Sequence, residues 1–326
     1  MNDSRYVLAA DVGGTNLRIA AVDSDGTILH LSGVATPRSG AAAEIVGAIL
    51  SGARDCIVVS GGRPLAFGLA LPALVNSPAG CVLSSPNLPQ LDGLALVKEV
   101  EDGLDLATVI ENDATAAAVG EHWLGSSKAV ENSIFVTLGT GVGGGLILNG
   151  QPYRGIDGTA GEIGHICVEP DGLPCGCGSR GCVEQYASAT AIARIATEIA
   201  SSTGTPKNYG TAKAVFDAAS MGDPQAIEAF GSMGRYLGVA LADLVNVLNP
   251  EMIAIGGGAT GGWDFFIEDV RSEIRARAFR HPAERVVVVR ASLGESAGIL
   301  GAARVAFDSI LDASLPHSPT AAPRPV

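Results

Sequence analysis

The sequence predicts an α/β protein made of two lobes that share one internal design. It has 326 residues, 47% of them hydrophobic, and its 43 glycines suit a fold with many tight strand–helix junctions. The opening pattern of strand, glycine-rich turn and strand, VLAADVGGTNLRIAAVDSDG at residues 7–26, recurs at residues 133–151 as SIFVTLGTGVGGGLILNGQ. We interpret the recurrence as the duplication of a three-strand unit, with one copy in each lobe and a cleft between the lobes.

In the first half, short apolar runs bounded by turn residues predict strands, and longer segments with helical spacing predict helices. The expected strands lie at residues 6–12, 17–22, 27–34, 65–71 and 106–111. The expected helices lie at residues 40–54 and 92–101, and an alanine-rich helix starts at 114.

The second half is mainly helical. We expect helices at residues 184–202, 211–220, 223–248, 263–280 and 296–312, the third of them broken near Gly231 and Gly234. Strands are expected at 251–256 and 285–290, and the VVVV run at 286–289 predicts apolar cover on both faces.

These elements predict a small lobe over residues 1–117 and a large lobe over 118–295. The last helix, 296–312, is expected to pack back on the first lobe. The tail at 313–326 contains four prolines and little else that is apolar, so we expect it to be disordered.

Charge and composition exclude several classes of function. The formal net charge of −13 argues against a nucleic acid or an anionic membrane held by bulk attraction. The N-terminus lacks the basic and apolar regions of a signal peptide, and no apolar run reaches transmembrane length. We therefore expect a cytoplasmic protein, in which clustered cysteines favour a metal over disulfides.

The segment HICVEPDGLPCGCGSRGCVE at residues 165–184 carries the most specific signal. One histidine and three cysteines match the ligand count of a closed tetrahedral zinc site, and the glycines allow a tight loop. We favour such a site over reduced thiols without metal. The predicted ligands are His165, Cys175, Cys177 and Cys182, and Glu162 and Glu184 bracket them. The remaining cysteines, Cys56, Cys81 and Cys167, are interpreted as small core residues.

Three glycine-rich segments each follow an apolar strand, which suggests a nucleotide site. Backbone N–H groups exposed by glycines can face phosphates, and a threonine adds a hydroxyl donor. One such loop by itself is equally well explained as a hairpin turn. The predicted nucleotide-binding residues are Asp11, Gly13, Gly14, Thr15, Asn16, Gly139, Thr140, Gly141, Gly256, Gly257 and Gly258. Asp11, at a strand end, could hold a metal ion through water.

Two further positions have both a local and a chemical interpretation. Asn112 or Asp113 can simply cap the helix that follows, but a carboxylate at a strand end can also accept a hydroxyl proton. Asn87, in Pro86-Asn87-Leu88, can be part of a turn or can supply an amide to a polyol.

Taken together, these motifs resemble those of the ROK family of sugar kinases, repressors and related open reading frames. DVGGTN is similar to that family's first phosphate loop, LGTGVGGG to its second and IGGG to its adenosine segment. AGEIGH followed by CGCGSRGCVE is similar to its sugar and zinc signature. The resemblance implies the duplicated, two-lobed actin-like ATPase fold, ATP and Mg²⁺ as cofactors, and a structural Zn²⁺.

The resemblance also implies roles for individual residues. Asp113 would accept the proton of the sugar's 6-hydroxyl. The sugar would be bound by Gly68, Asn87, Asn112, Asp113, Glu162, His165 and Glu184. Gly68 opens a segment, GLALPALV, that resembles the family's sugar-facing GxxxPG strand end, except that Ala73 replaces the usual glycine.

The implied activity is the ATP-dependent phosphorylation of a hexose, with glucose preferred, by a homodimer. Alternatives within the family are kinases for N-acetylmannosamine, N-acetylglucosamine, fructose, mannose or allose, and polyphosphate could replace ATP. A sugar-sensing repressor of the same fold is disfavoured, because Asp11 opens the first loop almost at once and the chain is strongly acidic.

Overall fold

The computed structural model describes residues 5–37, 40–204 and 206–314, and its contacts divide the chain into two compact units. The first unit contains the residues up to Asn112 and those from Ala302 on, and the second runs from Asp113 to Gly301. The lobe boundary expected at residue 117 would divide the helix that follows residue 112. In the structure this helix lies wholly in the second unit. Of the expected tail, residues 313 and 314 continue the last helix, and 315–326 lie outside the described residues.

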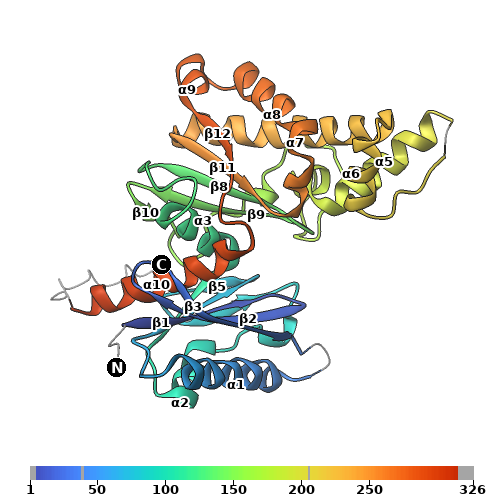
Figure 1. Cartoon of the computed structure of the whole chain (residues 1–326). Helices are drawn as coiled ribbons and strands as arrows, with labels where there is room; N and C mark the ends of the chain where they lie inside the picture. The colour runs from blue at the N-terminus through green and yellow to red at the C-terminus, as the bar shows by residue number, and fades with distance from the viewer. Residues whose placement is uncertain (1–4, 38–39, 205, 315–326) are drawn as a thin grey trace. The chain divides into compact units, whose positions relative to one another are not determined.

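The first unit is built on a five-stranded sheet with the order β3-β2-β1-β4-β7 (Figure 1). β1, β2 and β3 are antiparallel, and β4 and β7 continue the sheet in parallel with β1. Its strands are β1 (Tyr6–Val12), β2 (Asn16–Asp23), β3 (Ile28–Ala35), β4 (Phe67–Leu71) and β7 (Thr108–Asn112). A separate hairpin of β5 (Leu74–Asn76) and β6 (Cys81–Ser84), which the sequence did not predict, follows β4.

Helices cover both faces of this first sheet. α1 (Ala42–Ser60) buries Ile45, Ile49, Ala53 and Cys56, whose spacing of three or four residues makes one apolar stripe. α1 and α2 (Leu96–Leu104) pack on one side, and α10 (Ala297–Ser314) packs on the other. A Cβ built on Gly68 of β4 would lie 2.0 Å from the Ala302 carbonyl oxygen, so α10 approaches the strand at backbone distance.

The second unit repeats the sheet of the first. Its order is β10-β9-β8-β11-β12, again with three antiparallel strands extended by two parallel ones. The strands are β8 (Ser133–Leu138), β9 (Val142–Leu148), β10 (Gln151–Pro152), β11 (Met252–Gly256) and β12 (Val287–Arg290). The identical strand order confirms the duplicated α/β fold that the recurring sequence pattern predicted.

The helices of the second unit include one long parallel pair, α7 packed on α8, in which Gly234 meets Phe266 and Gly238 meets Val270, with shorter helices around it. The helices are α3 (Asp113–Trp123), α4 (Glu184–Ala187), α5 (Ala189–Ser202), α6 (Ala212–Ser220), α7 (Pro224–Leu248), α8 (Trp263–Arg277) and α9 (Arg280–Arg285). Four short 3₁₀ turns lie at Pro89–Leu91, Ile163–His165, Gly258–Gly262 and Gly294–Ser296 among the described residues.

Four sequence-based expectations are wrong. α7 does not break near Gly231 and Gly234; a Cβ on Gly234 would lie 2.5 Å from the Phe266 carbonyl oxygen, so this glycine allows α8 to pack closely. The expected helix 184–202 ends at Ala187 and restarts after Ser188, whose hydroxyl caps α5 by accepting from the Ala191 amide.

The other two errors concern burial. The valine run ends in β12, the last strand of its sheet, so Val287 is 51% exposed and lacks apolar cover on one face. Cys167 is exposed, whereas Cys56 is buried as expected and Cys81 is half-buried. Among the described residues, no helix combines the length and the apolar character needed to cross a membrane.

Candidate functional site

The first glycine loop joins β1 to β2 in a tight turn. The Gly13 N–H donates to the Asn16 carbonyl at 2.9 Å, and the Thr36 hydroxyl donates to the Gly13 carbonyl at 2.7 Å. The Gly13 amide is therefore used within the turn. Gly14 and the exposed Thr15 and Asn16 form the rest of the loop, so the anion-binding role predicted for it rests on these residues.

Asp11, predicted to act near the metal of a bound nucleotide, forms an ion pair. It lies directly opposite Arg18 in the β1–β2 register, and Nη2 of Arg18 lies 2.5 Å from Oδ2 of Asp11. Both side chains are partly exposed, so the pair orients the carboxylate without removing it from solvent. Arg18 had no role assigned from sequence, although its position seven residues after Asp11 fits a cross-strand pair around this turn.

A small hollow lies beside the first loop, within the first unit. It has a volume of about 320 Å³ and is lined by Gly14, Pro37, Asn87, Leu88, Pro89 and Gln90. A Cβ on Gly14 would lie 3.3 Å from that of Asn87, so the phosphate-loop candidate and a sugar-binding candidate are neighbours. Gln90 also lines the hollow, and sequence reasoning missed it.

The other two sugar-binding candidates of the first unit differ in their surroundings. Asn112, the last residue of β7, donates through Nδ2 to the Ala73 carbonyl at 3.2 Å, at the end of the GLALPALV segment. Gly68 is buried within β4 and faces the backbone of α10. The structure therefore explains the glycine at 68 by helix packing, and its contact with sugar remains a prediction.

The second and third glycine loops lie against each other in the second unit. Gly257 has a φ of +87°, and a Cβ there would lie 2.5 Å from the Leu138 carbonyl oxygen, next to Gly139. Gly139 in turn accepts at its carbonyl from the Ala189 amide at the start of α5. The two segments predicted to bind phosphate and adenosine are thus brought together, although residues 141 and 256 are 115 positions apart in the chain.

The later glycines of LGTGVGGG serve packing rather than an open anion loop. Gly143 and Gly145 lie in β9, where their missing side chains leave room for Ala114 and Ala118 of α3. α3 begins at Asp113, whose Oδ1 accepts from the Ala114 amide at 2.8 Å. Asp113 is half-buried, and it combines the helix-end role with the exposure that a proton acceptor needs.

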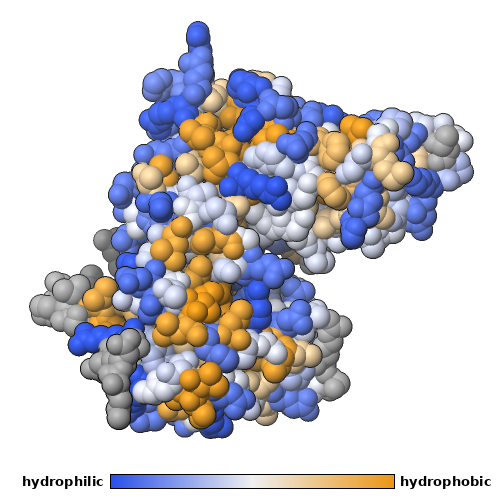
Figure 2. All heavy atoms as spheres, viewed as in Figure 1, coloured by the Kyte–Doolittle hydropathy of each residue, from blue (hydrophilic) through white to orange (hydrophobic). Residues whose placement is uncertain are grey.

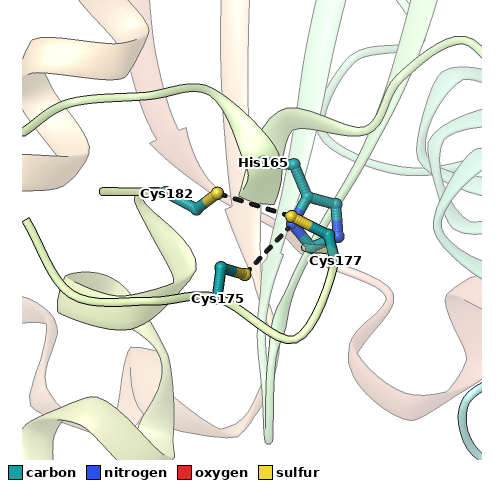
Figure 3. A group of neighbouring side chains, drawn as sticks. All are labelled: His165, Cys175, Cys177 and Cys182. Atoms are coloured by element: carbon teal, nitrogen blue, oxygen red, sulfur yellow. Dashed lines mark hydrogen bonds between the residues drawn. The ribbon is translucent and has the colours of Figure 1, made fainter. Parts of the chain in front are cut away.

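The four predicted zinc ligands converge on one point (Figure 3). The ligand atoms of His165, Cys175, Cys177 and Cys182 all lie within 4.8 Å of one another. His165 ends a 3₁₀ turn, and the cysteines come from the loop that leads into α4. Nδ1 of His165 lies 3.7 Å from Sγ of Cys175, and Sγ of Cys177 lies 3.7 Å from Sγ of Cys182.

These separations fit a tetrahedral zinc ion. With Zn–S near 2.3 Å and Zn–N near 2.05 Å, tetrahedral angles place two sulfurs about 3.8 Å apart and a sulfur and a nitrogen about 3.6 Å apart. Cys182 is fully buried and Cys175 is 8% exposed, and Nε2 of Gln185 donates to Cys175 Sγ at 3.7 Å. A donor to a ligand sulfur is the outer support usual for such sites.

The two carboxylates that bracket the cysteines face the same cluster. Nε2 of His165 lies 3.8 Å from Oε2 of Glu162, so the ring points Nδ1 at the cysteines and Nε2 at this carboxylate. Burial raises the pKa of Glu162 and Glu184 adds to the rise, while His165 opposes it. Oε2 of Glu184 accepts from the Val142 amide at 3.0 Å and thereby joins the cluster to the second glycine loop.

The predicted site residues are therefore divided between the units. Gly68, Asn87 and Asn112 belong to the first unit, and Asp113, Glu162, His165 and Glu184 belong to the second. Within the second unit, Glu162, His165 and Glu184 lie around one cluster of thiols. Acceptor carboxylates, a ring nitrogen and amides form a set that suits neutral hydroxyl groups, because each can be matched by a hydrogen bond.

Comparisons with known proteins show the family of this chain. The ROK family matches residues 7–309. A glucokinase of Halalkalibacterium halodurans is 37% identical over an alignment of 317 residues that covers 92% of this chain and 94% of that protein. An N-acetylmannosamine kinase of Yersinia pestis is 34% identical over 93% of this chain and 99% of its own length.

A solved structure of a related protein has the same fold. A ROK family glucokinase of Streptomyces griseus, in complex with glucose and AMPPNP, is 36% identical and has a TM-score of 0.79. The match covers 93% of this chain and 99% of that one. The two duplicated sheets are those of the actin-like ATPase fold, as predicted, and the chain belongs to the ROK family.

Proposed function

We propose that this protein transfers the γ-phosphoryl group of ATP to the 6-hydroxyl of a hexose, with glucose as the preferred acceptor. The single observation that supports this best is the cluster of Glu162, His165 and Glu184 around the thiol site, in a chain similar to glucokinases over nearly all its length. The proposal includes a homodimer in the cytoplasm, where ATP is available.

In this mechanism Asp113 accepts the proton of the 6-hydroxyl as the hydroxyl oxygen forms a bond to the γ-phosphorus. The bond from that phosphorus to the β,γ-bridging oxygen breaks, and ADP leaves with the electron pair. Placing Asp113 at the first position of α3 holds its carboxylate on a rigid element, which favours a fixed geometry for proton transfer.

Sugar recognition would depend on matched hydrogen bonds. A buried polar group left without its partner costs about 1–3 kcal/mol, so each carboxylate or amide that meets a hydroxyl contributes to discrimination. We assign Asn87, Asn112, Glu162, His165 and Glu184 to the hydroxyl groups. His165 can serve metal and sugar together, because its Nδ1 faces the cysteines and its Nε2 does not.

The metals would have separate tasks. Zn²⁺ held by His165, Cys175, Cys177 and Cys182 would have four protein ligands and no open position, so its role would be structural. By fixing the loop between Glu162 and Glu184 it would hold both carboxylates in place. Mg²⁺ accompanies ATP and reduces the charge of the phosphates; Asp11, oriented by Arg18, would hold it through water.

The nucleotide phosphates would meet donors from two loops. Gly14, Thr15 and Asn16 would contribute from the first loop, and Gly139, Thr140 and Gly141 from the second. Gly256, Gly257 and Gly258 would pack beside the adenosine, where the absence of side chains leaves the backbone open to a flat ring.

The test of the proposal is the Asp113→Asn variant. We expect it to lose phosphoryl transfer by at least a factor of about 100, the lower end for a general base, while keeping its affinity for glucose. ADP release measures the first quantity and calorimetry the second. Asp55→Asn, an exposed carboxylate of α1, is the matched control and should behave as the wild type. Wild-type turnover by Asp113→Asn would contradict the role of this residue.

The acceptor and the donor are decided by a second assay. ADP release is measured over glucose, mannose, fructose, allose, N-acetylmannosamine and N-acetylglucosamine, and product formation is compared for ATP and polyphosphate. We expect the highest kcat/KM for glucose with ATP. Absence of transfer to every sugar, with sugar binding intact, would instead indicate a sugar-binding protein without kinase activity.

A further inference from the structure

Cys167 lies beside the predicted zinc ligand Cys182, although sequence analysis assigned it to the core. The two residues are partners in an isolated antiparallel bridge. Cys167 is exposed, whereas Cys182 is fully buried. We propose that these two cysteines form a redox-active pair, whose disulfide opens the metal site and releases zinc. The inference rests on the zinc site of the proposed function.

The backbone hydrogen bonds define how the two cysteines face each other. The Val168 amide donates to the Gly181 carbonyl at 2.8 Å, and the Val183 amide donates to the Ile166 carbonyl at 2.9 Å. These bonds flank the two cysteines, so Cys167 and Cys182 are a non-hydrogen-bonded pair. Such pairs have Cα atoms about 4.5 Å apart and side chains on the same face. A disulfide requires Cα atoms about 4.4–6.8 Å apart.

Exposure determines which thiol reacts first. Cys167 does not belong to the group of four ligands, so its thiol stays uncommitted when the metal is bound. Cys177 is also exposed and its sulfur lies 3.7 Å from that of Cys182, but both of these sulfurs belong to the metal cluster. A thiolate bound to zinc is a weaker nucleophile than a free one, so an oxidant in solution should meet Cys167 first.

Disulfide formation needs a two-electron oxidant, and a hydroperoxide is such an oxidant. The Cys167 sulfur attacks one peroxide oxygen and breaks the O–O bond, which gives a sulfenic acid and one molecule of water or alcohol. The Cys182 sulfur then attacks the sulfenic sulfur, the S–S bond forms and the oxygen leaves as water. The Cys167 thiol and the zinc-bound Cys182 thiolate together lose two electrons and one proton. The peroxide takes up both electrons and this proton, and the solvent supplies the second proton. Because the disulfide removes Cys182 from the ligand set, the zinc ion has only three protein ligands left and is released.

The disulfide would change the sugar site because both cysteines lie two residues from a predicted sugar ligand. His165 precedes Cys167 by two positions, and Glu184 follows Cys182 by two. Without zinc the loop between Glu162 and Glu184 loses its central support. We therefore expect oxidised protein to bind hexose at least tenfold more weakly, and a dithiol with added zinc to restore the affinity.

The experiment compares the wild type with Cys167→Ser and with Cys81→Ser, a half-buried cysteine of the other unit that serves as the matched control. Reduced proteins are first analysed for zinc and for hexose affinity. They then receive hydrogen peroxide, and a chromogenic chelator records zinc release. Peptide mass mapping after alkylation identifies disulfides. Because Cys167 is exposed and outside the ligand set, Cys167→Ser should retain zinc and fold normally.

We expect the wild type and Cys81→Ser to release zinc together with formation of the 167–182 disulfide, and Cys167→Ser to release it at least tenfold more slowly. Equal rates of release from all three proteins, or a 177–182 disulfide as the main product, would overturn the proposal. A reduced wild type without zinc would refute the zinc site of the proposed function itself. If only the proposal of the Cys167–Cys182 pair is wrong, the reduced protein will still contain zinc.

Discussion

The contact between Gly141 and Glu184 provides a sharp test of how the sugar site is held. A Cβ built on Gly141 would lie 2.3 Å from Oε2 of Glu184, the oxygen that accepts from the Val142 amide. Gly141 is not among the glycines with positive φ, so alanine is compatible with its backbone. In Gly141→Ala the methyl group must therefore displace the carboxylate rather than strain the chain.

The structure sets the size of the effect. The end of a glutamate side chain moves easily, so the loss of stability should be limited to one charge-assisted hydrogen bond, about 1.5–3 kcal/mol at most. A displaced carboxylate would leave a sugar hydroxyl unmatched, at a cost of about 1–3 kcal/mol. That cost corresponds to a rise of about 5- to 150-fold in the dissociation constant for hexose.

Calorimetric titration of hexose in the absence of nucleotide measures this constant directly. Gly139→Ala is the matched control in the same loop, because a Cβ at Gly139 meets nothing within 4 Å. We expect Gly139→Ala to bind hexose as the wild type does. An unchanged hexose affinity in Gly141→Ala, or an equal loss in both variants, would refute the role that we assign to the Glu184 carboxylate.

Two further predictions concern the metal and pH. Cys177→Ser should lose zinc and bind hexose about tenfold or more weakly, as metal analysis and calorimetry would show, and unchanged affinity in zinc-free protein would contradict the positioning role of the metal. Asp223 caps α7, and the hydrogen bond from Lys207 lowers the pKa of its carboxyl below the usual range, with the Ala226 amide adding to the effect and burial opposing it. A carboxyl whose pKa is lower in the folded protein than in the unfolded chain stabilises the folded protein at pH values above the unfolded-state pKa. This stabilisation is lost as the pH falls through the folded-state pKa. Asp223→Asn keeps a capping oxygen, so the free energy of unfolding of the wild type should exceed that of this variant by under about 1 kcal/mol at pH 7. Urea unfolding of both proteins below about pH 4 should show that the difference vanishes.

Local patterns predicted much of the fold and of the candidate site. The four metal ligands lie within 18 residues of one another, so their chemistry and spacing could be recognised without the fold. The two hairpins could be recognised for the same reason, since each consists of adjacent strands around a glycine turn. The family resemblance added the roles of Asp113 and of the sugar ligands, which no local pattern specifies.

Other residues could not be found in this way. Glu121 had no predicted role, yet it is fully buried in α3, and its carboxylate accepts from the Ser126 and Leu293 amides. The Leu293 amide is 172 positions away. A buried carboxylate is identified by the donors that surround it, and these donors come from segments that sequence spacing does not relate.

Residue type and short spacing were enough to predict the duplicated α/β design, the three glycine segments and the cluster of one histidine and three cysteines. The folded structure was needed to show which glycines face helices and which line loops, since backbone approach depends on partners far along the chain, as with Gly234 and Phe266. It also decided that Cys167 is exposed and paired with Cys182. The pairing of two backbone segments, and not the spacing of cysteines, brings Cys167 opposite Cys182.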